Sequence, residues 1–233
     1  TMIITFNECK RILQEIQGKV AIIYHWDTDG IASSTIILKH LLDHDVKLTS
    51  IVNIVPRVGE YSVNAIDVKR IKHLKPDIIL ILDYSLKQWD LERLERELDA
   101  PILLVDHHLN VYRENLKKTM IYNPVVASQG RQYYPSTTWV LRELLDLPMN
   151  FHVVLGVVGD VGVNVVNCSV WGEVKSYLDS RGWCLEDIMR ACETLDSLSR
   201  ALNLEAVEKA PYKLLKYNTP YDVIGDKEWA TIR

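Results

Sequence analysis

Three apolar runs, each closed by a polar motif and separated by helical patterns, constrain the fold more than any other feature. They cover residues 19–24, 77–83 and 102–105, and the last two read as strands buried on both faces. Apolar residues at helical spacing follow the first two runs, over 31–43 and 87–99. This alternation predicts an α/β fold with a doubly wound, mostly parallel sheet and flanking helices.

The rest of the chain fits the same layout and adds a helical C-terminal extension. The further predicted elements are a helix over 7–17 capped by Asn7, a strand over 47–55, a polar helix over 61–74, a turn at Asn123-Pro124, a helix from Ser136 or Thr137 to Leu145, a helix from Asn150 to Val158, helices over 171–180, 185–201 and 204–216, and an irregular segment over 217–233.

The amino-acid composition helps to distinguish between a soluble globular protein, a membrane protein and a nucleic-acid binder. Hydrophobic residues make up 48% of the 233 residues and charged residues 25%, as in ordinary soluble globular proteins. No apolar run approaches the roughly 20 residues that a membrane-spanning helix needs, so we expect no membrane. The net charge of −4 does not indicate a nucleic-acid binder, but acidic metal ligands lower this count without describing the surface elsewhere.

The cysteine pattern and the N-terminal segment indicate the cellular compartment in which the protein is expected. Cys9, Cys168, Cys184 and Cys192 form no CxxC pair and no zinc-finger spacing. The segment Thr1-Met2-Ile3-Ile4 lacks the basic region and long apolar core of a signal peptide. Scattered thiols without such a signal predict a reducing, cytoplasmic location.

The segment His25-Trp26-Asp27-Thr28-Asp29-Gly30 joins the first strand to its helix. Because side chains alternate along a strand, His25, Asp27 and Asp29 can project the same way. Gly30 would allow a sharp turn into the helix. Three such side chains repel one another unless a cation lies between them. The simpler interpretation is an Asp-Gly turn in which an aspartate caps the helix.

Three more motifs lie where strands or helices are predicted to end. Asp83 closes the second run, and Asp106-His107-His108 follows the third. Asp160 lies between two glycines at the end of an otherwise apolar helix, where a surface-loop aspartate is the alternative interpretation. In a doubly wound sheet ligands bind beyond the carboxyl ends of the strands. We therefore expect these acidic motifs at one edge of the sheet.

The collected side chains offer carboxylate and imidazole without thiolate, a donor set that suits Mn²⁺ or Mg²⁺ rather than structural zinc. There are too many for one octahedral ion, whereas two ions about 3.5–4 Å apart would use them all. Such a pair activates a water and neutralises charge on phosphate oxygens. The residues alone thus predict hydrolysis of a phosphate ester or anhydride. They are His25, Asp27, Asp29, Asp83, Asp106, His107, His108 and Asp160.

The order of these motifs resembles the DHH phosphoesterase family, over about residues 19–165. That family includes RecJ-type single-strand exonucleases, oligonucleotide-degrading enzymes, manganese pyrophosphatases and exopolyphosphatases. The sequence pattern HxDxDG-I-x-S, from His25 to Ser33, is closest to that of the RecJ-like nucleases, particularly those of archaeal type. Asn123-Pro124 followed by a Ser/Thr-initiated helix also resembles the RecJ-like core. The resemblance implies a RecJ-like exonuclease that hydrolyses single-stranded DNA or RNA by a two-metal-ion mechanism.

The resemblance also implies the metal ligands. Asp83 matches the ligand that bridges the two ions, with Mn²⁺ favoured over Mg²⁺. His25 and Asp27 would complete one ion. The ligands of the other ion would be Asp29, His107 and Asp160.

Two residues of the third motif have other implied roles. His108 would lie against the substrate phosphate, where it stabilises charge or aids the leaving group. Asp106 would accept a hydrogen bond that orients one imidazole, as metal-bound histidines commonly require. Both are therefore expected to act in catalysis.

The sequence departs from the family in one respect. Family members carry a C-terminal domain with a glycine-rich phosphate-binding loop, whereas Gly172, Gly182 and Gly225 stand alone here. We expect a catalytic α/β domain over 1–165, and an extension over 166–233 that packs on it or leads to a further substrate domain.

Alternative functions follow from the same site. One is a small-molecule phosphohydrolase acting on short oligonucleotides, cyclic dinucleotides, pyrophosphate or polyphosphate. A non-catalytic replisome scaffold is less favoured, because every expected ligand is present. The expected partners are single-stranded nucleic acid or a short oligonucleotide, and a replication or repair protein. Aromatic residues at such positions are more often core residues, but the candidates for an aromatic approach groove are Trp26, Trp89, Tyr133 and Tyr134.

Overall fold

The computed structural model describes residues 2–232. These residues form two compact units. The first unit runs to His25 and continues over Lys39–Tyr134, and the second comprises Trp26–Leu38 and the chain from Pro135 onward. The chain therefore passes from one unit to the other inside the first acidic motif.

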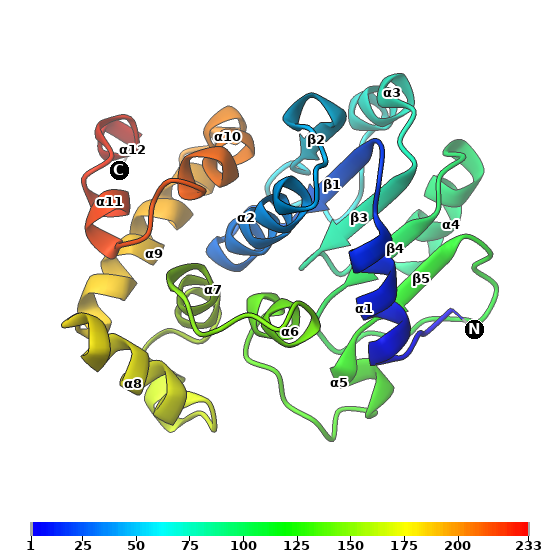
Figure 1. Cartoon of the computed structure of the whole chain (residues 1–233). Helices are drawn as coiled ribbons and strands as arrows, with labels where there is room; N and C mark the ends of the chain where they lie inside the picture. Colours follow the sequence, from blue (N-terminus) through cyan, green and yellow to red (C-terminus); the bar gives the residue numbers. More distant parts are fainter. Residues whose placement is uncertain (1, 233) are drawn as a thin grey trace. The chain divides into compact units, whose positions relative to one another are not determined.

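The first unit contains a five-stranded sheet in the order β2-β1-β3-β4-β5, with every pairing parallel (Figure 1). This confirms the predicted doubly wound parallel α/β fold. The strands are β1 (Val20–Tyr24), β2 (Ile51–Ile54), β3 (Ile78–Leu82), β4 (Ile102–Val105) and β5 (Thr119–Tyr122).

The central strands are buried along their whole length, which agrees with their continuous apolar sequences. The predicted strand at 47–55 is shorter, because Leu48–Ser50 forms the 3₁₀ turn η1 before β2 begins. β5 was not predicted, since its four residues follow a long polar segment without helical or strand periodicity.

The register aligns the carboxyl ends of three strands. Leu82 at the end of β3 pairs with Tyr24 of β1 on one side and with Val105 of β4 on the other. The residues that follow the strands are His25, Asp83 and Asp106, so they leave the sheet at the same edge. The sheet thereby gathers three of the predicted site residues.

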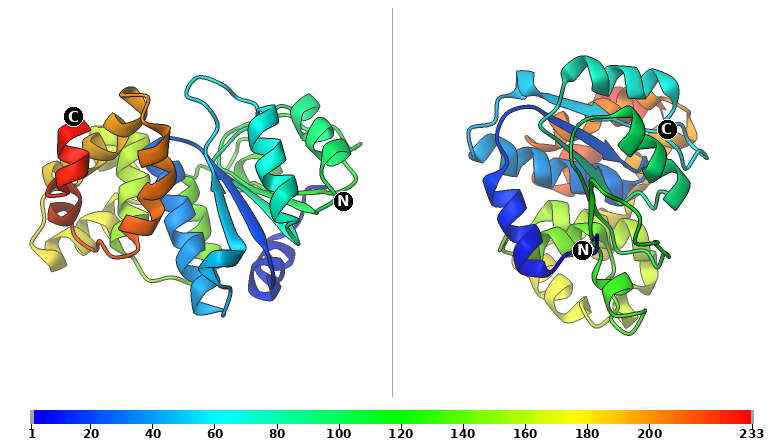
Figure 2. Two further views of the ribbon diagram at one scale, coloured as in Figure 1. Left: turned by 90° about the horizontal axis from the view of Figure 1, so that it is seen from above. Right: turned by 90° about the vertical axis from the view of Figure 1, so that its right-hand side faces the viewer.

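Helices cover both faces of this sheet. α3 (Ala65–Leu74) and α4 (Gln88–Glu97) lie on one face, and α1 (Phe6–Glu15) lies on the other (Figure 2). The short α5 (Pro124–Ala127) follows β5 and is capped by Asn123 where a simple turn was predicted. The prediction that Asn7 caps the first helix is wrong. Thr5 is the cap, in a capping box with Glu8.

The second unit is helical. It contains residues 28–38 of α2 (Thr28–Asp43). Its other elements are α6 (Thr137–Leu144), α7 (Phe151–Val161), η2 (Gly162–Asn167), α8 (Trp171–Arg181), α9 (Leu185–Arg200), α10 (Leu204–Leu214), α11 (Pro220–Ile224) and α12 (Lys227–Ile232). Helix α9 packs against α7, α10, α11 and α12, and α6 lies beside α7 (Figure 1).

The prediction of an irregular segment over 217–233 is wrong for the part that the structure describes, which ends at residue 232. Thr219 and Asp222 form a capping box that starts α11 at Pro220. Trp229 of α12 is buried and makes an edge-to-face contact with Tyr217. Tertiary packing of Trp229 thus stabilises helices too short to form by themselves.

The helical unit begins at Pro135 in the second half of the chain, earlier than the extension predicted from residue 166. A functional domain over 1–165 stays a prediction. Among the described residues no single helix has the length and apolar character to cross a membrane. One bent pair, Phe151–Asn167 with Trp171–Arg181, meets that criterion by length and composition alone.

Candidate metal centre

The first acidic motif has a different local structure from the one predicted. β1 ends at Tyr24 and α2 begins at Thr28, so the predicted strand-like alternation is wrong. Gly30 does not make a turn but lies in the first turn of α2, where its N–H donates to Asp27 Oδ1 at 2.9 Å. Asp27 therefore caps α2, the role given to an aspartate by the simpler interpretation.

Asp83 follows β3 with its backbone in an unusual conformation. Its φ is +55°, in the left-handed region that costs a non-glycine residue about 1–2 kcal/mol. The sheet holds this conformation, because the Asp83 N–H donates to the carbonyl of Val105 at 3.0 Å. The side chain is almost completely buried. Strained backbone of this kind gathers at functional sites, where the surrounding structure enforces it.

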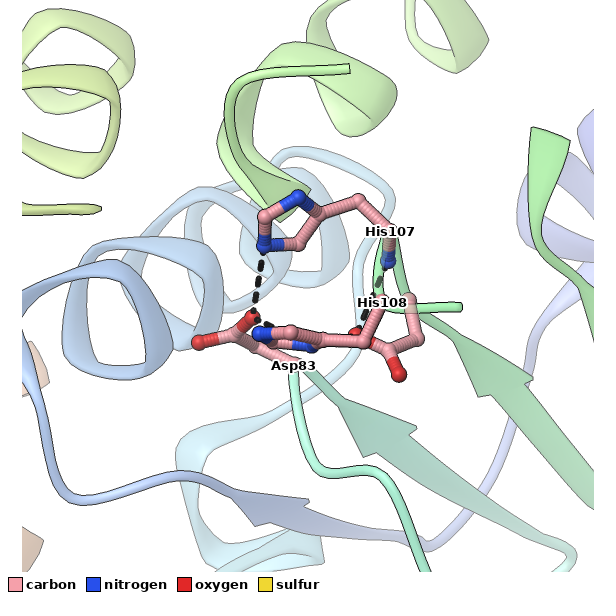
Figure 3. Close-up of side chains that lie close together, drawn as sticks. Asp83, His107 and His108 are labelled. Atoms are coloured by element: carbon pink, nitrogen blue, oxygen red, sulfur yellow. Dashed lines mark hydrogen bonds and ion pairs between the residues drawn. The ribbon is translucent and has the colours of Figure 1, made fainter. Parts of the chain in front are cut away.

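The Asp106-His107-His108 motif brings two imidazoles to Asp83 (Figure 3). Asp83 Oδ1 lies 3.5 Å from His107 Nε2 and 3.8 Å from His108 Nδ1. With Asp106, these residues offer four ligand atoms within 4.8 Å of one another. Figure 3 shows both rings beside the Asp83 carboxylate.

Hydrogen bonds orient both rings. His107 Nδ1 lies 2.9 Å from the carbonyl oxygen of Tyr134, which can only accept, so Nδ1 carries the proton. In the neutral ring Nε2 then bears the lone pair and faces Asp83. Asp106 Oδ1 accepts from His108 Nδ1 at 2.7 Å and from the His107 N–H at 2.8 Å. Asn123 Nδ2 donates to the His108 carbonyl and holds the backbone of the motif.

This cluster fits a divalent cation. Asp83 and Asp106 place two carboxylates in a buried environment, which is unfavourable unless positive charge accompanies them. Asp106 Oδ2 is buried and has no hydrogen-bond partner among residues 2–232. Imidazole nitrogen and carboxylate oxygen are the donors that Mn²⁺ accepts. Burial and donor chemistry thus both favour a metal here.

His25 lies at the same edge, beside two tyrosines. It offers a nitrogen within 4.8 Å of an Asp83 oxygen. Its ring stacks on Tyr61 at 6.2 Å and lies 6.0 Å from Tyr84. The Tyr84 hydroxyl donates to the carbonyl of Glu60, and burial raises the pKa of this tyrosine. These contacts place the His25 imidazole next to Asp83.

Asp29 and Asp160 belong to the second unit, and each offers an oxygen within 4.8 Å of the other. Asp29 is fully buried at the N-terminus of α6, where Oδ2 accepts from Thr137 N at 2.8 Å and Oδ1 from Thr138 N at 3.1 Å. A carboxylate there is stabilised by the helix dipole. Gly156 of α7 leaves room for it, because a Cβ at that position would lie 2.6 Å from Asp29 Oδ1.

Asp160 lies at the end of its helix, in the last turn of α7, and not in the surface loop of the alternative interpretation. A negative charge in the last turn of a helix is unfavourable. Helix stability therefore does not explain Asp160. Its proximity to Asp29 gives it a place in a cluster of acidic ligands.

The structure thus divides the eight predicted site residues into two groups. In the first unit lie His25, Asp83, Asp106, His107 and His108. In the second unit lie Asp27, Asp29 and Asp160.

Sequence reasoning missed the groups that hold these side chains. The carbonyl of Tyr134 and the N–H groups of Thr137 and Thr138 are backbone atoms, and no residue type signals them. Ser136, predicted as a possible cap, does cap α6 through Trp139 N. Ser136 is thus the sequence signal for the start of α6, whose first N–H groups bind the Asp29 carboxylate.

Comparison with known proteins places the chain by family and by fold. The DHH family, N-terminal domain, matches residues 19–155, which is more than half of the chain. No curated protein matches the sequence.

Solved structures similar to this chain share its fold. They include exonuclease RecJ bound to manganese (17% identity, TM-score 0.63, 97% of this chain and 65% of that one) and RecJ in complex with Mn²⁺ from Thermus thermophilus (16%, 0.62, 97% and 37%). The DHH domain of a protein described as a member of a family of ribosomal proteins is also similar (14%, 0.59, 96% and 60%). The chain therefore spans less than two thirds of the length of these relatives.

Proposed function

The chain belongs to the DHH family, and we propose that it is a metal-dependent phosphodiesterase, a RecJ-like exonuclease that hydrolyses single-stranded DNA or RNA. The observation that carries this proposal is the cluster at the carboxyl edge of the sheet, in which the buried carboxylates of Asp83 and Asp106 lie beside the imidazoles of His107 and His108. Its donors suit a divalent ion, and hydrolysis at phosphorus is the chemistry that such ions support in a site open to water.

The family resemblance supports an assignment of ligands to two ions, with Mn²⁺ favoured over Mg²⁺. Asp83 would be shared by the two ions, and His25 and Asp27 would complete the ligands of one of them. Asp29, His107 and Asp160 would hold the other. When bound, such ions lower the pKa of a water and neutralise charge on the phosphate oxygens.

The histidines of the third motif have separate tasks. The Tyr134 carbonyl keeps the proton of His107 on Nδ1, so Nε2 is the ligand atom. Asp106 holds His108 through Nδ1, which places Nε2 on the far side of the ring. His108 is half exposed, in contrast to His107, and we assign its Nε2 to a phosphate oxygen of the substrate. Asp106 therefore orients a residue that contacts the substrate.

Two exposed aromatic residues are candidates for contact with a nucleic-acid substrate. Of the four candidates for an approach groove, Trp26 is buried and Tyr134 is partly covered. Trp89 is 54% exposed and Tyr133 is 61% exposed, and bases of a single strand can stack on such rings. The small-molecule phosphohydrolase is the second candidate. A replication or repair partner and a cytoplasmic location stay predictions.

The test is hydrolysis in Mn²⁺ of end-labelled single-stranded DNA and RNA, beside pyrophosphate and a dinucleotide. Asp83→Ala is the inactivating variant, and Asp99→Ala, which removes an exposed carboxylate from the loop before β4, is the matched control. Laddering of the labelled strands that only Asp83→Ala abolishes would support the nuclease. Turnover of the small substrates alone would favour the second candidate. Failure to bind Mn²⁺ or to hydrolyse any substrate would refute both.

A further inference from the structure

Asp196 is a largely buried carboxylate on α9 that contacts the start of α2. Its Oδ1 accepts two hydrogen bonds from Thr28, one from the N–H at 3.0 Å and one from the hydroxyl at 2.7 Å. Thr28 is the first residue of α2 and stands between Asp27 and Asp29. Asp196 lies beyond residues 19–155, the part that matches the family, and no sequence motif marks it.

These hydrogen bonds complete the N-terminus of α2. The first N–H groups of a helix have no partner within the helix. Asp27 satisfies the N–H of Gly30, and Asp196 satisfies that of Thr28. Hydrogen bonds to an ionised carboxylate are stronger than neutral ones, and the helix dipole favours a negative charge at this end. Asp196 therefore holds the residue that joins two candidate metal ligands.

The side chain of Thr28 is enclosed on two sides. Its hydroxyl lies 3.2 Å from the carbonyl of Cys192, on the same helix as Asp196. On α7, a Cβ added at Gly159 would lie 2.7 Å from Thr28 Cβ, so the two residues are in close contact. Asp160 directly follows Gly159. The contact of Thr28 with α7 and α9 thus links the positions of Asp29 and Asp160.

A carboxylate in this place has a cost. Burial raises the pKa of Asp196, the Thr28 hydroxyl opposes that effect, and the charge of Asp27 adds to it. A neutral cap such as asparagine or serine would satisfy the same N–H without a second buried charge. The two hydrogen bonds from Thr28 and the helix dipole offset part of this cost, and they hold the carboxylate against the residue that joins Asp27 and Asp29.

We propose that Asp196 is a positioning residue that acts through Thr28 to hold Asp27 and Asp29 in place for a divalent cation. This inference rests on the proposed function. Because Asp196 lies beyond residue 155, Mn²⁺ binding in this proposal requires the helical part of the chain that follows the matched region. Asp196 itself touches neither substrate nor metal in this proposal.

The test is calorimetric titration of the full chain with Mn²⁺, together with thermal unfolding in the absence of metal. Asp196→Ala is expected to lower the Mn²⁺ affinity by about 10- to 100-fold, as loss of a residue that orients a ligand does. Asp196→Asn should lose less, because its amide oxygen still accepts from Thr28. The matched control is Glu193→Gln, which removes an exposed charge from the same helix and should bind Mn²⁺ as the wild type does.

The outcomes separate the possibilities. A folded Asp196→Ala variant with wild-type Mn²⁺ affinity would overturn the inference, whatever its melting temperature, because a purely structural cap changes only stability. If that variant does not fold, Thr28→Val decides, since it keeps the shape and removes the hydroxyl. A several-fold loss of affinity in it supports the inference, and an unchanged affinity overturns it. Absence of Mn²⁺ binding in the wild type would instead overturn the proposed function, and the inference with it.

Discussion

Gly156 is the position where the smallest change should have the clearest effect. In Gly156→Ala the new methyl group would lie 2.2 Å from Thr138 Oγ1, 2.3 Å from Thr138 Cγ2 and 2.6 Å from Asp29 Oδ1. Thr138 cannot simply rotate away, because its hydroxyl donates to the Val153 carbonyl at 3.0 Å and its N–H is bonded to Asp29. The substitution therefore forces α6 and α7 apart or displaces Asp29.

The expected change in the free energy of unfolding is the difference between the cost of overpacking and the gain in helix propensity. Overpacking a tight contact costs typically 1–3 kcal/mol, and the three contacts below 3.0 Å put the cost at this site at about 3 kcal/mol. Replacing a helical glycine by alanine gains about 1 kcal/mol of helix propensity. The net loss of about 2 kcal/mol corresponds to a fall of roughly 4–8 °C in the melting temperature of a chain of this size.

The assay is thermal unfolding of Gly156→Ala beside Gly172→Ala. Gly172 is also helical, in α8, but a Cβ there would meet no atom within 4 Å. Gly172→Ala should therefore be as stable as the wild type or up to about 1 kcal/mol more stable. Equal stability of the two variants would refute the argument that α6, α7 and Asp29 are packed in van der Waals contact at Gly156. Mn²⁺ affinity should fall in Gly156→Ala alone.

Three further predictions follow from the site and its surroundings. Mn²⁺ at 100 times its dissociation constant should raise the melting temperature by about 5–11 °C, since binding adds about 2.7 kcal/mol to stability, and a chelator should reverse this. Burial raises the pKa of Asp226, but hydrogen bonds from the Trp229 N–H, the Tyr217 hydroxyl and Lys213 outweigh that effect, so the net pKa lies below the ordinary 3.8. The ionised Asp226 carboxylate therefore stabilises the fold above pH 3.8, and this stabilisation is lost as the pH falls through the lower pKa of the folded chain. In urea unfolding, the free energy of unfolding of Asp226→Asn should change less with pH in this range than that of the wild type. Asp106→Asn should lower kcat about 10- to 100-fold with little change in melting temperature, because it weakens the hold on His108.

Each of these predictions has an outcome that would count against it. A melting temperature indifferent to Mn²⁺ would argue against a resident ion. A pH dependence of Asp226→Asn equal to that of the wild type would show that this carboxylate has the same pKa in the folded and unfolded chains. Wild-type kcat in Asp106→Asn would remove Asp106 from the proposed reaction.

The sheet was predictable because burial on both faces leaves a plain signature. Every residue between Asp77 and Asp83 and every residue over 102–105 is apolar, and both stretches form central strands. β5 gave no such signal. Its pairing with β4 depends on a partner that local periodicity does not reveal.

Helix ends were harder to predict at the first acidic motif. Gly30 suggested a turn, yet Asp27 and Asp196 together satisfy the N–H groups that allow α2 to start at Thr28. Asp196 is 168 residues from Thr28 in the chain, so local sequence carries no trace of its influence. Long-range capping of this kind can only be seen in a folded structure.

Local sequence was enough to identify the kinds of ligand and the strand ends that carry them, because periodicity and residue chemistry are local properties. How those ligands are held depends on long-range packing. The left-handed backbone of Asp83, the proton position of His107 and the burial of Asp29 under Thr137 and Thr138 all rest on backbone groups from distant elements. Every residue type offers the same N–H and C=O, proline's missing N–H apart, so only folding selects which of them meets a given side chain.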